Sequence, residues 1–118
     1  MSTPLSELRD YRTTTRRMLS EGDDPLSVSL AADSRLVEVA NQVAICHRVL
    51  AEARADLRHS FFPDRKRLES KIREAGDVLV ELEEIQSELI DVKSECVKRT
   101  RAELARINQV INELLGKR

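Results

Sequence analysis

Apolar side chains recur at alternating steps of three and four residues through the last half of this chain, and that periodicity sharply restricts its fold. The mean step is close to 3.5 residues, the repeat that keeps one face of a helix against a partner helix in a left-handed supercoil. The pattern predicts one long helix over about residues 64–115, which either continues through Gly76 or divides there, with Asp77 as the cap of a new helix. The apolar row comprises Leu68, Ile72, Ala75, Leu79, Leu82, Ile85, Leu89, Val92, Cys96, Thr100, Leu104, Ile107, Ile111 and Leu114.

A second stretch with the same spacing predicts another helix over about residues 34–60. Phe61, Phe62 and Pro63 end it, because the residue before a proline is biased away from helical geometry. Two helices joined by so short a break fold back as an antiparallel hairpin. The apolar positions of this second helix are Leu36, Val39, Val43, Cys46, Leu50, Ala53 and Leu57.

The N-terminal segment predicts a short helix over about residues 4–19, with Thr3 as its cap and Pro4 at its first position. Gly22 and Pro25 then predict a linker over residues 20–33, in which residues 25–33 form either a helical turn or an extended link. Three glycines, three prolines and 3% aromatic residues argue against an architecture of many short strands. We therefore predict a single all-α domain over residues 1–118, an elongated antiparallel helical hairpin (a coiled coil) with a short N-terminal helix.

The two predicted long helices differ in length, and this difference predicts self-association. The helix over residues 34–60 covers only the first half of the helix over 64–115, so residues 93–115 need the N-terminal helix, another subunit or a protein partner. A narrow hairpin also buries little apolar surface by itself. The predicted interface for an oligomer or partner comprises Leu36, Val39, Val43, Leu50, Leu57, Leu89, Leu104, Ile107, Ile111 and Leu114.

Charged residues make up 35% of the chain, although its net charge is only −1, and they are arranged in rows. Like charges three and four residues apart oppose a helix by about 0.2–0.5 kcal/mol per pair, so a row of carboxylates calls for compensation. We hypothesise that the N-terminal helix, from the same or another subunit, lies along this acidic row. The alternative is that both rows are solvated faces. The acidic row is Asp77, Glu81, Glu84, Glu88, Asp91 and Glu95, and the basic row is Arg9, Arg12 and Arg16.

Two clusters of basic residues are candidate phosphate contacts of a nucleic acid. One cluster surrounds the predicted hairpin tip beside Phe61 and Phe62, and aromatic rings next to basic side chains can stack on bases. The alternative is that the two phenylalanines cap the apolar row while the basic residues keep the loop in water. The candidate contacts are Arg65, Lys66, Arg67, Lys98, Arg99 and Arg101.

The order of charges in the long helix resembles that of a family of nucleic-acid accessory proteins. The acidic heptads DVLVELEEIQSELIDVKSE are followed by the basic amphipathic segment VKRTRAELARINQVINEL. Together they resemble the C-terminal half of phage UvsY-type recombination mediators over residues 64–116, through periodicity and charge order. The resemblance implies a small helical oligomer that binds single-stranded DNA and loads a recombinase.

Other features weigh against catalysis and against a membrane span. The chain has no glycine-rich phosphate loop and no zinc-like spacing of cysteine and histidine, so we expect no catalytic site, metal or cofactor. It also has no run of about 20 apolar residues and no signal peptide. Cys46 and Cys96 lie in the apolar rows, which is typical of free thiols in the cytoplasm. The leading hypothesis is a non-catalytic coiled-coil scaffold, adaptor or assembly factor, and the alternatives are a nucleic-acid accessory protein and a partner-specific chaperone.

Overall fold

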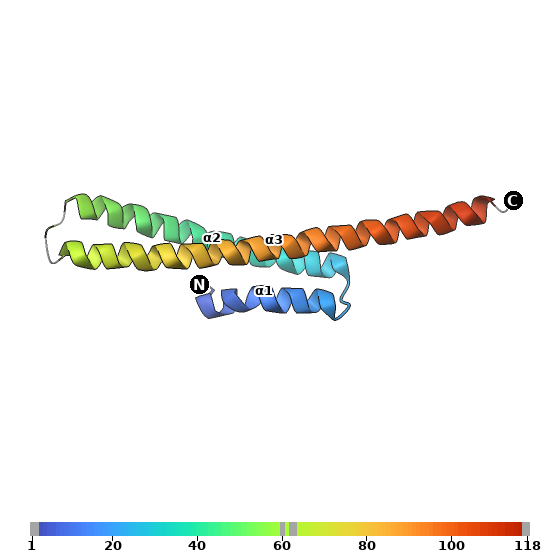
Figure 1. Cartoon of the computed structure of the whole chain (residues 1–118), viewed down its shortest axis with the longest axis horizontal. Helices are drawn as coiled ribbons and strands as arrows, with labels where there is room; N and C mark the ends of the chain where they lie inside the picture. Colours follow the sequence, from blue (N-terminus) through green and yellow to red (C-terminus); the bar gives the residue numbers. More distant parts are fainter. Residues whose placement is uncertain (1–2, 60, 62–63, 117–118) are drawn as a thin grey trace.

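Three helices make up the part of the chain that the computed structural model describes, namely residues 3–59, 61 and 64–116. They are α1 (Leu5–Ser20), α2 (Pro25–Arg58) and α3 (Asp64–Gly116). As Figure 1 shows, α2 and α3 form a long antiparallel hairpin, and α1 lies beside the middle of α3 and runs in the same direction. The molecule measures 85 × 23 × 20 Å. The predicted all-α, elongated hairpin with a short N-terminal helix is confirmed.

The connection between α1 and α2 is shorter than the sequence predicted. Residues 25–33 are the first part of α2, so the predicted linker over residues 20–33 and the predicted helix start at residue 34 are wrong. The reason is local, because Pro25 occupies the first turn and the Asp24 carboxylate accepts a hydrogen bond from the Ser27 backbone N–H at 3.3 Å. Gly22 turns the chain between the helices with a φ of 87°.

Helix α3 continues without a break through Gly76, for 53 residues. A glycine inside a helix costs only about 1 kcal/mol relative to alanine, which packing on α2 readily offsets. At about 1.5 Å per residue the helix is roughly 80 Å long, so it accounts for most of the length of the molecule.

The core lies where all three helices meet. Its main cluster joins Leu8 and Tyr11 of α1 to Val39 of α2 and to buried residues of α3. A second cluster joins Leu19 of α1 and Val28 of α2 to the next turns of α3. These contacts explain why the middle of α3 is the best buried part of the hairpin. The buried α3 residues in the two clusters are Leu82, Ile85, Leu89, Val92 and Cys96.

Polar contacts between α1 and α2 set the position of α1 along the hairpin. The Tyr11 hydroxyl donates a hydrogen bond to the Glu38 carboxylate, and the Arg35 guanidinium donates one to the buried hydroxyl of Thr15. The same guanidinium lies 5.1 Å from the centre of the Tyr11 ring, a cation–π distance. Because a one-turn slip of α1 would leave the buried Thr15 hydroxyl without this donor, the contacts favour a single register.

The Tyr11 contact predicts a loss of stability at alkaline pH. Burial of the phenol and its hydrogen bond to Glu38 raise the pKa of Tyr11 from 10.0 to about 12. Between these pH values the unfolded chain releases a proton that the folded chain retains, so stability falls as pH rises through this window. In urea unfolding, the free energy of unfolding of Tyr11→Phe should decline less steeply between pH 10 and 12 than that of the natural chain. Equal declines in the free energy of unfolding of the two proteins would show that the raised pKa of Tyr11 does not cause the loss of stability.

Candidate interaction surface

The distal part of α3, residues 101–116, extends past the ends of α1 and α2, and its first turns, as far as Arg106, line hollows with the α1–α2 connection and the start of α2. Every side chain in this segment, which we call the arm, is exposed, and Figure 1 shows it projecting beyond both other helices. The arm is bare because α2 begins at Pro25, which lies opposite Thr100 and Arg101. Apolar residues nevertheless recur at steps of three and four residues from just before the arm to its end. We call this row the arm seam. The arm seam comprises Val97, Thr100, Leu104, Ile107, Ile111 and Leu114, and its aliphatic members are between 44% and 66% exposed.

An open groove between α2 and α3 leads directly into the arm seam. One part of it, about 310 Å³ in volume, is lined by Pro25, Leu26 and Ser29 of α2 and by Cys96, Val97, Thr100 and Arg101 of α3. The adjoining part, about 380 Å³, is lined by Leu36, Ile90 and neighbouring α3 residues, and Val97 belongs to both. We call these two parts together the α2–α3 groove. Helix α1 contributes no lining residue to it, because α1 packs on the opposite side of α3 beside Val92 and Glu95.

An ion pair and further exposed apolar residues border the α2–α3 groove. The Lys93 ammonium of α3 pairs with the Asp33 carboxylate of α2 across it. On α2, Leu30 and Val37 follow Leu26 along the same side of the helix, and both are exposed. The elongated helices therefore carry apolar surface suited to a partner or to another copy of the chain.

The predicted interface residues fall into two groups in the structure. Val39, Leu50 and Leu89 are buried, and Leu36, Val43 and Leu57 are partly buried against the chain's own helices. The subunit interface predicted at the three buried positions is wrong, because residues of the same chain already cover them. Helical periodicity cannot distinguish a row buried within a subunit from a row buried between subunits. The exposed group consists of Leu104, Ile107, Ile111 and Leu114.

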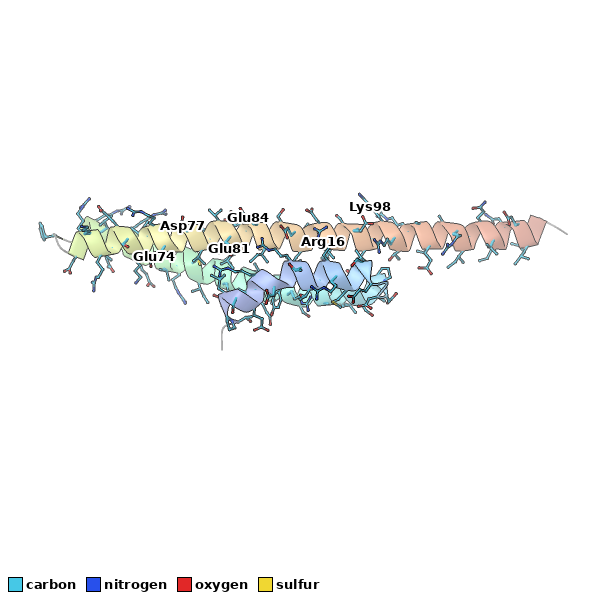
Figure 2. All side chains as sticks on the ribbon, turned by 60° about the horizontal axis from the view of Figure 1, so that its bottom comes forward. Arg16, Glu74, Asp77, Glu81, Glu84 and Lys98 are labelled. Atoms are coloured by element: carbon cyan, nitrogen blue, oxygen red, sulfur yellow. The ribbon has the colours of Figure 1, made fainter. Side chains whose placement is uncertain are left out.

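Helix α1 of the same chain lies along part of the acidic row. The Arg9 guanidinium donates two hydrogen bonds to the Glu81 carboxylate, with 3.0 Å between Nη2 and Oε2. The Arg12 Nη1 atom lies 3.9 Å from Glu88 Oε1. In Figure 2, Glu81 lies on the edge of α3 nearer to α1, whereas Asp77 and Glu84 lie on the far edge.

The remaining members of the two rows are in looser or different surroundings. Arg16 lines a shallow hollow together with Asp91 and Glu95, and Glu95 also pairs with Arg99 one turn along α3. Asp77 and Glu84 are exposed. The docking hypothesis therefore applies to the acidic residues that face α1, such as Glu81. The alternative of a solvated face applies to Asp77 and Glu84, on the outer side of the row.

The contact between Arg9 and Glu81 shifts the pKa values of both side chains. The hydrogen bond from Arg9 holds the pKa of the Glu81 carboxyl below its usual 4.5, and the pKa of Arg9 is raised by the same contact. Because the pKa of Glu81 is lowered in the folded chain, the pair adds stability above about pH 4.5. This contribution is lost as the pH falls through the lowered pKa.

Reversing the basic row should loosen α1. In Arg9→Glu/Arg12→Glu/Arg16→Glu, attraction to the acidic row becomes repulsion, so we expect a lower Tm by circular dichroism, with the deficit reduced at high salt. Arg48→Glu/Arg54→Glu/Arg73→Glu changes the net charge equally at exposed positions of α2 and α3 outside the basic row, and serves as the control. Equal Tm values for the two triple variants would show that the rows do not hold α1.

The candidate phosphate contacts do not converge on one surface. Arg65, Lys66 and Arg67 are exposed near the hairpin tip, and Arg65 lies 3.5 Å from Glu69. Lys98 lies roughly 50 Å away along α3, at about 1.5 Å per residue. Figure 2 shows Lys98 pointing away from α1.

The remaining candidate contacts also lie in surroundings that differ from one another. Arg99 donates hydrogen bonds to Glu95 and to the Leu19 carbonyl oxygen, whereas Arg101 is exposed beside the α2–α3 groove. Phe61 is 86% exposed, so the alternative that it caps the apolar row is wrong, and Phe62 lies outside the described residues.

Sequence reasoning missed the α2–α3 groove and the contacts that bridge the helices. Leu26, Leu30 and Val37 recur at helical spacing and follow Asp24 and Pro25, so the sequence did carry a signal for the helical segment that forms the groove. The contact between Lys93 and Asp33 had no comparable signal, because it depends on the register between α2 and α3.

The described residues contain no cluster of three or more His, Cys, Asp or Glu side chains placed to hold a metal ion. None of the helices, within the described ranges, is both long and apolar enough to cross a membrane. In comparisons with known proteins, no family model, no curated protein and no solved structure matches this chain.

Proposed function

We propose that this protein is a non-catalytic helical scaffold whose copies assemble through the arm seam. The observation that carries the proposal is the arm itself, because its apolar side chains recur along a continuous helix and yet are about half exposed. An isolated helix of this length is marginal in water, so an arm with such a seam gains most of its stability from a second helix.

The molecule consists of a packed three-helix part and a projecting arm, and this arrangement supports the same proposal. The part in which α1, α2 and α3 meet has its own core and polar contacts that set its register, so it can act as a rigid base. The arm extends from that base as an unbroken continuation of α3 (Figure 1). A rigid base with a projecting apolar helix positions other helices at a set distance and direction, which is the task of a scaffold.

The direct test is the solution mass by light scattering, measured at low and high salt. Apolar assembly through the arm seam predicts at least twice the chain mass of 13.4 kDa at both salt concentrations. An oligomer that dissociates at high salt would place the charged rows at the interface instead. A monomer over the whole concentration range would overturn the proposal.

The same samples distinguish the scaffold from a nucleic-acid accessory protein. A labelled single-stranded oligonucleotide is added at low salt, where contacts between phosphates and basic residues are strongest. The scaffold proposal predicts no binding. Binding that falls steeply with salt and is lost in Lys98→Glu/Arg101→Glu would show that the exposed basic residues contact phosphates, and the proposal would then be wrong.

A further inference from the structure

We propose that the α2–α3 groove is the docking site for the arm of a second copy of this chain, with the two α3 helices antiparallel. Each arm would occupy the groove of the other copy, so the pair forms a closed two-fold dimer. Each end of this dimer is a four-helix bundle of α1, α2, α3 and the arm of the second copy. The inference rests on the proposed self-assembly and adds the site, the occupant and the direction.

The lengths of the groove and of the arm agree. The groove borders α3 from Ile90 to Arg101, and the apolar part of the arm runs over residues 104–115. At about 1.5 Å per residue, each segment extends over roughly 17 Å. One chain therefore carries an exposed apolar helix segment and an open groove of matching length.

The direction follows from where these two features join. The groove ends at Arg101, which is also where the arm begins. If two copies cross near this residue and run antiparallel, each arm lies over the groove of the other. If they run parallel, the arms pair only with each other beyond Arg101, and both grooves stay uncovered. The antiparallel arrangement is thus the one that covers both apolar surfaces.

The chemistry of the two surfaces is also compatible. Leu26, Leu36, Ile90 and Val97 present an apolar lining to an apolar arm seam. Three basic side chains also line the groove: the ammonium of Lys93 is paired with Asp33, whereas Lys98 and Arg101 are exposed, so their charged ends reach water while their aliphatic stems line the groove. In a two-fold pair each copy contributes both its groove and its arm seam to the interface, so the apolar surface of both features counts toward the about 800 Å² per partner that a stable interface buries.

A two-fold arrangement also limits the assembly to two copies. The surface that binds and the surface that is bound occur on both copies, and each is used once, so the contact is isologous and closes on itself. We expect a dimer whose mass does not grow with concentration. A filament or a ladder of higher species would contradict this closure.

The direction is tested by crosslinking two single-cysteine proteins built on a Cys46→Ala/Cys96→Ala background that retains the melting curve of the natural chain. One carries Ser94→Cys, beside the groove, and the other carries Asn112→Cys, near the end of the arm and on the same flank of α3. They are mixed, allowed to exchange and treated with a short bismaleimide. Antiparallel docking predicts crosslinks between the two proteins and few within either one.

The possible outcomes separate this inference from the proposed function. Dimers in which each cysteine protein crosslinks mainly with itself would overturn the antiparallel arrangement and leave the scaffold in place. A monomer by light scattering would overturn both.

The role of the groove is tested with one substitution and a matched control. Leu26→Glu, within the groove, should weaken dimerisation at least tenfold. Val80→Glu, at an apolar α3 position of similar exposure outside the groove, should leave it unchanged. Equal dimerisation constants for the two variants would remove the groove from the interface.

Discussion

Truncating Leu89 to alanine is expected to lower the free energy of unfolding by about 2–5 kcal/mol. Leu89 is fully buried in the cluster where α3 meets Leu8 of α1 and Val39 of α2. The lost methyl groups leave a cavity that three helices in fixed register cannot easily close. Because small domains are stable by only about 5–15 kcal/mol, this single change removes a large share of the total. Urea unfolding followed by circular dichroism measures it.

A matched change on the same helix provides the control for Leu89→Ala. Val80→Ala also removes methyl groups from an apolar α3 side chain, but Val80 is exposed, so we expect a loss within about 0.5 kcal/mol. If Leu89→Ala cost no more than Val80→Ala, the three helices would not share a common core at this point.

Replacing Leu104 and Ile111 by lysine is expected to convert the assembled protein into a monomer with an intact three-helix base. Both side chains are about half exposed within the chain and occupy equivalent positions of the arm seam, one heptad apart. Docking the arm would then bury two ammonium groups in an apolar groove. At about 1.4 kcal/mol per tenfold change, a loss of even this amount for each of the two docked arms weakens dimerisation by about 100-fold. Light scattering over a dilution series measures the change.

Adding lysine changes the charge and solubility of the chain wherever it is placed. The control for Leu104→Lys/Ile111→Lys is therefore a variant with the same added charge outside the arm seam. Ala102→Lys/Ala105→Lys places two ammonium groups on the opposite side of the arm helix and should leave the mass unchanged. The seam variant should also lose helical signal from the released arm but keep the cooperative unfolding of the base. An unchanged mass in the seam variant would show that the arm seam does not hold the copies together.

The sequence predicted the helical elements and much of the core for one physical reason. Steps of three and four residues define a helix face through local geometry alone, so the row around Leu82, Ile85 and Leu89 could be assigned to a core without knowing what covers it. The error at the start of α2 had a different origin. The segment from Pro25 to Asp33 is short and contains three serines or aspartates, and the start signal given by Asp24 and Pro25 was interpreted as the end of α1 instead.

The candidate interface could be predicted only in part. Leu104 and Ile111 lie in a part of the long apolar row that exceeds the length of any partner helix in the chain, and length is a property of the sequence. The α2–α3 groove was not predicted, because it forms between residues such as Leu26 and Val97 that are far apart in the chain. Its existence depends on which side of α3 is taken by α1.

The sequence by itself determined that this chain forms long amphipathic helices, that two of them pair as a hairpin, and that α3 is longer than its partner. These properties follow from local periodicity and from segment length. Only the tertiary structure decided that α1 docks on α3 within the same chain beside Glu81, and that the opposite side of α3 stays open next to Leu26 and Ile90. Helical periodicity specifies that a face is apolar, whereas the choice of what covers it depends on packing between distant segments.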